Sequence, residues 1–141
     1  MMISQTAEYA LRSVVWLGGR PDEQVGTKQI SEAAQVPAGY LAKVLQMLAR
    51  SGLVVSTAGR GGGFRLTRPP EEISVLDVIN AVDPIQRIRE CPLELKGHGV
   101  NLCPLHRRLD DAMAQMETAF ARSTVAEMLA EETGSPPLQE L

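Results

Sequence analysis

Residues 27–66 read TKQISEAAQVPAGYLAKVLQMLARSGLVVSTAGRGGGFRL, and this stretch decides the fold. Thr27 can cap a short helix that reaches about Gln35. Val36-Pro37 ends that helix, because proline lacks an amide hydrogen and disfavours helical angles in the residue before it. A second helix then begins near Pro37 and ends where Gly52 can adopt a left-handed cap. Its inner face is Leu41, Val44, Leu45 and Leu48.

A glycine-rich hairpin follows these two helices. Residues 53–57 are rich in branched side chains and predict a strand, and Phe64 and Leu66 alternate with polar residues as its returning partner. The tip, residues 58–63, reads AGRGGG and holds four glycines and one arginine, Arg60. A purely structural hairpin needs only one or two glycines, so the longer run predicts that this backbone comes close to another molecule.

Helical patterns flank this stretch on both sides. A first helix follows the possible caps Ser4 or Thr6 and stops at Gly18-Gly19, with Trp16 assigned to the core. A later helix opens on Ser74 with Asp77 in a capping box and runs to about residue 82. The expected fold class is mainly α with a small β-hairpin wing. We expect four parts: residues 1–82 as the head domain, 83–103 as a cysteine-containing loop, 104–130 as a dimerisation helix region, and 131–141 as a flexible tail.

A heptad-like apolar stripe marks the helix that begins near Pro104. Such a stripe needs a partner, and self-association is the interpretation we favour. The alternative is that the helix packs on its own domain. Thr124 can cap a last short helix through Leu129. The stripe consists of Leu102, Leu105, Leu109, Ala112, Met116 and Ala119, widened by Met113 and Phe120.

Charge divides the chain into two halves, although the net charge is only −3. Residues 1–70 hold eight basic and four acidic side chains, whereas residues 71–141 hold six basic and thirteen acidic ones. This split favours a basic front face for a polyanion. The absence of a long apolar run or of an apolar leader makes a cytoplasmic protein without membrane contact our expectation.

Helix, short helix, turn, helix and glycine-tipped hairpin is the order of a winged helix-turn-helix, which suits double-stranded DNA. The outward residues at the start of the helix near Pro37 would face the major groove, with Tyr40 mainly on phosphate. Arg60 at the wing tip could enter a narrow minor groove. A protein-binding winged helix is the alternative, and we find no enzyme-like nucleophile and base. The predicted DNA-binding residues are Thr27, Lys28, Ala38, Gly39, Tyr40, Lys43, Arg60, Gly61 and Gly62.

Four segments together resemble the Rrf2 family of bacterial winged-helix transcription regulators, over about residues 3–129. The resemblance implies a homodimer whose long C-terminal helices cross, with two heads on the halves of a palindromic operator. Many members carry a basic residue just before the first wing glycine, where this chain has Ala58. The segments are EYALR at 8–12, GYL at 39–41 running on to SGLV at 51–54, GRGGGF at 59–64, and ISVLDVI at 73–79.

Cys91 and Cys103 are the only cysteines, and in a reducing compartment such a pair is more readily a ligand or redox pair than a structural disulfide. Many Rrf2 members hold an iron-sulfur cluster on three cysteines spaced by five residues each. This chain matches the outer two and has Gly97 in the middle place. The resemblance therefore disfavours a four-iron cluster, whereas a two-iron (2Fe-2S) cluster needs two further ligands.

The resemblance points to three candidates for those ligands. His106 follows Cys103 by three residues, Glu8 stands where some relatives supply an acidic ligand from the other subunit, and His98 adjoins the vacant middle place. Three alternatives stay open: a regulator without a cluster, a zinc site, and a reversible Cys91–Cys103 disulfide.

Overall fold

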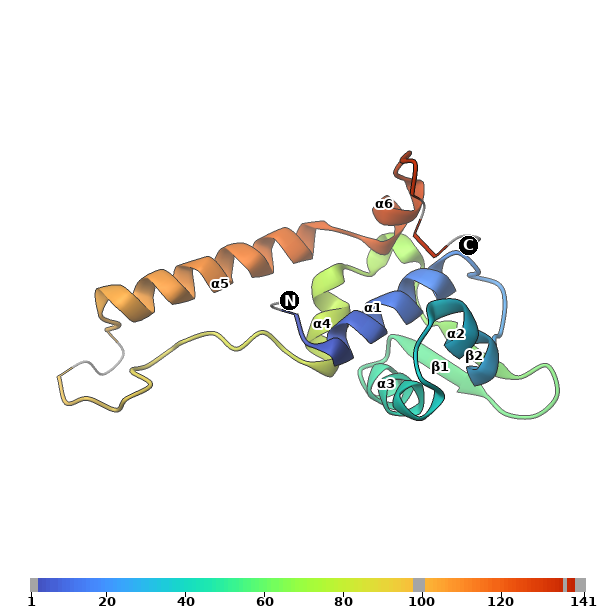
Figure 1. Ribbon diagram of the computed structural model, residues 1–141, viewed down its shortest axis with the longest axis horizontal. Helices are drawn as coiled ribbons and strands as arrows, with labels where there is room; N and C mark the ends of the chain where they lie inside the picture. The colour runs from blue at the N-terminus through green and yellow to red at the C-terminus, as the bar shows by residue number, and fades with distance from the viewer. Residues whose placement is uncertain (1–2, 98–100, 136, 139–141) are drawn as a thin grey trace.

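The computed structural model describes residues 3–97, 101–135 and 137–138. It confirms a mostly helical chain with one two-stranded antiparallel hairpin (Figure 1). The described elements, in chain order, are α1 (Gln5–Gly18), α2 (Thr27–Ala34), α3 (Ala38–Arg50), β1 (Val54–Thr57), β2 (Gly63–Leu66), η1 (Pro70–Glu72), α4 (Val75–Val82), α5 (Pro104–Arg122) and α6 (Val125–Ala130).

The head is built around one apolar core to which α1, α2, α3 and the hairpin all contribute. The predicted inner face of α3 is confirmed, because Leu41, Val44, Leu45 and Leu48 are all buried. The hairpin pairs Val54 with Leu66 and Thr57 with Gly63. Burial of this face holds α3 and the hairpin at fixed positions on one head.

Val25 adds a short bridge to the hairpin that the sequence did not predict. Its amide donates to the Phe64 carbonyl at 2.9 Å, and the Phe64 amide donates back to the Val25 carbonyl at 2.8 Å. These two bonds attach the wing to the loop before α2, and β1 also packs against α3. The base of the wing is therefore anchored on both sides.

The helix caps agree with the sequence with one exception. The Ser4 hydroxyl accepts from the Ala7 amide at 3.1 Å, and both Ser74 and Thr124 open capping boxes. The prediction that Thr27 caps α2 was wrong, because Gly26 holds the cap position and no side chain bonds to the free amides. Thr27 is instead the first residue of the helix, so its hydroxyl is not needed to start α2.

The long helix α5 projects away from α2, α3 and the hairpin, and the segment after α4 runs out beside it (Figure 1). No residue of α5 is fully buried. The chain then returns to the head through α6, where Val125 is completely buried and its amide donates to the Ile73 carbonyl at 2.9 Å. No helix among the described residues is long and apolar enough to cross a membrane.

Candidate nucleic-acid interface and cysteine loop

Six basic side chains of the head are exposed, and none of them makes an ion pair within the described residues. They lie on α2, α3 and the hairpin or directly beside these elements, which gather at one end of the molecule (Figure 1). Exposed cations that are not held in ion pairs can approach phosphates. The six are Lys28, Lys43, Arg50, Arg60, Arg65 and Arg68.

The first two turns of α3 present Ala38, Gly39 and Lys43 to solvent, as the sequence predicted. Tyr40 is different. Its hydroxyl is hydrogen-bonded to the Thr6 hydroxyl, and its ring meets the Tyr9 ring edge-on with centroids 5.1 Å apart. Tyr40 therefore anchors the start of α3 to α1, a contact across 34 residues that no local sequence pattern could reveal.

A second polar link joins α1 to the turn between α2 and α3. Arg12 Nε donates to Glu8 Oε1 at 2.8 Å, and Arg12 Nη1 donates to the Gln35 carbonyl at 3.1 Å. Gln35 ends α2 in the left-handed conformation, with φ of 53°. The predicted metal ligand Glu8 is thus paired within its own helix, and through Arg12 it supports the helix-turn-helix turn.

The wing glycines are explained by the hairpin itself, which corrects our inference from the glycine run. Gly59 and Gly61 have φ of 87° and 71°, which side chains rarely adopt. A Cβ on Gly62 would lie 2.2 Å from the Thr57 carbonyl oxygen. One on Gly63 would lie 2.6 Å from the Val25 backbone. All four glycines are thus required by the fold, so the run is not independent support for a close contact with DNA.

The two cysteines are unpaired, Cys91 is buried, and Cys103 is half-buried at the start of α5. Cys103 Sγ lies 3.4 Å from His106 Nδ1. Gly97, in the middle place, has φ of 93°, where a cysteine would be strained. His98 lies outside the described residues.

Soft thiolates and an imidazole suit iron chemically. However, the described residues of one protomer contain no group of three potential ligands close enough to hold a metal ion. These residues alone therefore do not fit a complete two-iron site, which needs four ligands.

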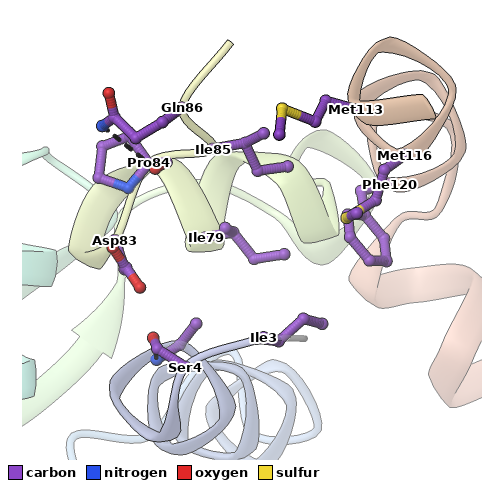
Figure 2. A pocket seen from close by; sticks show the side chains of 11 residues that line it. Ile3, Ser4, Ile79, Asp83, Pro84, Ile85, Gln86, Met113, Met116 and Phe120 are labelled. Carbon is purple, nitrogen blue, oxygen red and sulfur yellow. Dashed lines mark hydrogen bonds between the residues drawn. The ribbon is translucent and has the colours of Figure 1, made fainter. Parts of the chain in front are cut away.

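An apolar hollow of about 320 Å³ lies between α1, α4 and α5. Figure 2 shows Ile3 from just before α1, Ile79 from α4, and Met113 and Phe120 from α5 around it. Ile85, just after α4, points toward Met113 across this space (Figure 2). Part of the predicted α5 stripe, including Met113 and Phe120, therefore faces the head. The sequence pattern could not distinguish this part from the part that stays exposed.

A helix-turn-helix followed by an anchored wing, with exposed cations on both, defines a winged-helix DNA-binding transcriptional regulator. The comparison of families agrees with this class. The chain belongs to the Rrf2 family, whose model, described as an iron-dependent transcriptional regulator, matches residues 3–131. The chain is accordingly a regulator rather than an enzyme.

Individual relatives cover nearly the whole chain. A protein of Aquifex aeolicus (strain VF5), assigned as an HTH-type transcriptional regulator, is 27% identical over 132 residues, which are 92% of each chain. Among solved structures, T. potens IscR gives a TM-score of 0.75 at 22% identity and covers 94% of this chain and 93% of its own. The oxidized form of Staphylococcus aureus CymR gives a TM-score of 0.71 at 25% identity and covers 96% of this chain and all of its own.

Proposed function

We propose that this regulator works in the cytoplasm as a homodimer that places two heads on a palindromic operator. The observation that carries the DNA contact is the set of six exposed cations around α2, α3 and the wing, which form no ion pair with any residue that the structure describes. In this arrangement α3 lies in the major groove with Ala38, Gly39 and Lys43 toward the bases. The amides at the start of α2, beside Thr27 and Lys28, bind phosphate.

The wing supplies the second contact. Arg60 lies at its exposed tip between glycines that keep the backbone narrow. A narrow hairpin with one cation at its end fits the minor groove, where Arg60 senses groove width and Gly61 and Gly62 pass close to the sugar-phosphate backbone. Tyr40 positions α3, because its hydroxyl already has a partner in Thr6.

The exposed part of the α5 stripe supports the homodimer. Leu105 is 60% exposed and Leu109 is 46% exposed, and Ala112 continues the same side of the helix. Two large apolar side chains one turn apart on a projecting helix form a seam that a second copy of the same helix can cover. A two-fold crossing of α5 helices buries the same residues of both protomers and leaves both heads free for DNA.

The cysteine loop supplies the sensory part in our proposal. Cys91 and Cys103 are the groups whose chemical state the signal changes. One relative, the CymR of Staphylococcus aureus, is known in an oxidized form, which supports a redox-responsive role for these thiols. If a two-iron cluster forms, His106 and the Glu8 of a second copy are the further donors, and Glu8 must first leave Arg12.

The DNA contact is tested by Arg60→Ala and Lys43→Ala, each measured by fluorescence anisotropy on a duplex carrying the regulator's own promoter region. We expect each change to weaken binding by about tenfold, since such contacts contribute about 1–3 kcal/mol. Arg108→Ala is the matched control, because it removes one exposed cation from α5. Unchanged affinity of both head variants at physiological salt would contradict the proposed docking.

The chemical state of the cysteine loop is tested by purifying the protein without oxygen and recording its visible spectrum with iron and sulfide analysis. Iron and sulfide bound in a wild-type sample and absent from Cys91→Ser would establish a cluster. A colourless, iron-free protein that still binds DNA would eliminate the cluster and leave the thiols themselves as the sensor.

A further inference from the structure

Arg87 joins the cysteine loop to α5 through three short, charged hydrogen bonds. Its Nε and Nη2 donate to the two carboxylate oxygens of Asp110, each at 2.7 Å, and its Nη1 donates to Glu117 Oε1 at 2.8 Å. The next amide in the chain, from Ile88, donates to Asp110 Oδ1 at 2.9 Å. We call these four residues the Arg87 clamp. Only an arginine can make such a forked contact, because lysine carries a single ammonium group.

The surroundings make the clamp a firm attachment. The side chains of Arg87, Asp110 and Glu117 are 29%, 15% and 28% exposed, so each is largely covered. The Arg87 guanidinium holds the pKa of Asp110 down to about 2, and the two carboxylates raise the pKa of Arg87. Arg87 and Asp110 therefore both stay charged at every physiological pH.

The clamp lies close in sequence to both cysteines. Cys91 lies four residues after Arg87, and Cys103 lies seven residues before Asp110, next to the start of α5. With Arg87 attached at Asp110, each cysteine is within a few residues of a point fixed on the same helix. Without the clamp, the residues that lead to Cys91 lose this charged attachment to α5.

The other attachments near the clamp are weaker. The Ile85 amide reaches Asn80 Oδ1 only at 3.4 Å, and Ile85 itself contributes apolar contact across the hollow in Figure 2. The clamp is therefore the main polar link between the described part of the loop and α5. It also places Ile85 and Gln86, which line the hollow, next to the helix.

We propose that Arg87 is a positioning residue that holds the residues before Cys91 on α5, so that a chemical change at Cys91 or Cys103 acts on this helix. The sensory half of this statement rests on the proposed function of the thiols. With Arg87 bonded to Asp110 and Glu117, a displacement of the chain at Cys91 pulls on α5, whereas without these bonds it does not. Through α5, the change reaches the relative placement of the two heads.

The attachment is tested first by itself. In a Cys103→Ser background, the rate at which a maleimide labels Cys91 is compared between the parent and Arg87→Ala. We expect labelling to be at least tenfold faster without the clamp, and Arg87→Lys to fall between the two. Arg89→Ala is the matched control, because Arg89 is an exposed arginine two residues away that makes no ion pair within the described residues. Equal labelling rates in Arg87→Ala and the parent would overturn the proposal.

The coupling is tested on the full-length protein with both cysteines. The Kd for the promoter duplex is measured before and after treatment with diamide, which accepts two electrons and two protons as two thiols form one disulfide. We expect Arg87→Ala to keep the untreated Kd of wild type within about threefold, while the ratio of the two Kd values falls toward one. A merely structural role would change the untreated Kd as well.

The outcomes separate the two proposals. If wild-type affinity responds to diamide and Arg87→Ala responds equally, the positioning role is overturned and the thiol sensor stands. If wild-type affinity does not respond, the thiol sensor and the coupling both fail, and the labelling rates still decide whether Arg87 holds the residues before Cys91 on α5. If Arg87→Ala does not fold, Arg87→Lys and Glu117→Gln carry the same comparison, because each removes only part of the clamp.

Discussion

Replacing Leu105 and Leu109 together with alanine is expected to separate the proposed homodimer into folded monomers. Each change removes three carbon atoms, and a fully buried methylene contributes about 0.8 kcal/mol. Only the exposed fraction of each side chain, 60% and 46%, is available for burial by a partner. The loss is then about 1.4 and 1.1 kcal/mol, or about 5 kcal/mol for the four leucines of a dimer. At about 1.4 kcal/mol per tenfold change, the dimer dissociation constant rises between about 10³-fold and 10⁴-fold.

Sedimentation equilibrium over a wide concentration range measures this constant directly. The matched control is Arg107→Ala with Asp111→Ala, two exposed residues of opposite charge one turn apart on the other side of α5. The control is expected to dimerise like wild type. The free energy of unfolding of the monomer, measured in urea, is expected to change by less than about 0.5 kcal/mol, because the two leucines contribute little to the packing of the head. A leucine double variant that dimerises as tightly as wild type would refute the proposed α5 seam.

Three further predictions concern the head and the clamp. Gly62→Ala places a Cβ 2.2 Å from the Thr57 carbonyl oxygen. We therefore expect the free energy of unfolding, measured in urea, to fall by about 1–3 kcal/mol, and DNA binding to weaken. Gly18→Ala places a Cβ 2.7 Å from Val125 Cγ1. We expect a similar fall in the free energy of unfolding in urea, whereas the DNA contacts of the folded protein, measured by the binding assay, stay unchanged. The pKa of Asp110 is lowered from 3.8 to about 2, so its stabilising effect is present above about pH 4 and is lost as the pH falls through 2. The difference in the free energy of unfolding between wild type and Asp110→Asn, measured in urea, should therefore be constant from pH 8 to 5 and should shrink below pH 4.

The head could be predicted from sequence in most of its parts because its signals are local. The apolar spacing of Leu41, Val44, Leu45 and Leu48 identified the buried side of α3, and the Ser74 capping box identified the start of α4. The likeness of the motif order to the Rrf2 family was also correct. Each of these signals operates within a few residues, where helix geometry alone relates the side chains.

The contacts that tie these parts together could not be predicted, because they join residues far apart in the chain. The bond between Tyr40 and Thr6 is one example, and the Arg87 clamp is another, since an arginine in an irregular loop gives no sign of its partners. Residues 104–130, which include α6, were predicted to form one dimerisation region, but Val125 of α6 packs in the head core. The structural reason for the glycine run was also missed, because the number of glycines does not reveal the φ angle that each position requires.

The wing also limits which residues of the proposed minor-groove contact can be varied. Because Gly59, Gly61, Gly62 and Gly63 are each required by backbone geometry, only positions 58 and 60 in the tip are open to side chains. Ala58 and Arg60 are both exposed there. A library that seeks new operator preference through the tip therefore needs to vary just these two residues, and every variant in it keeps the same hairpin as its frame.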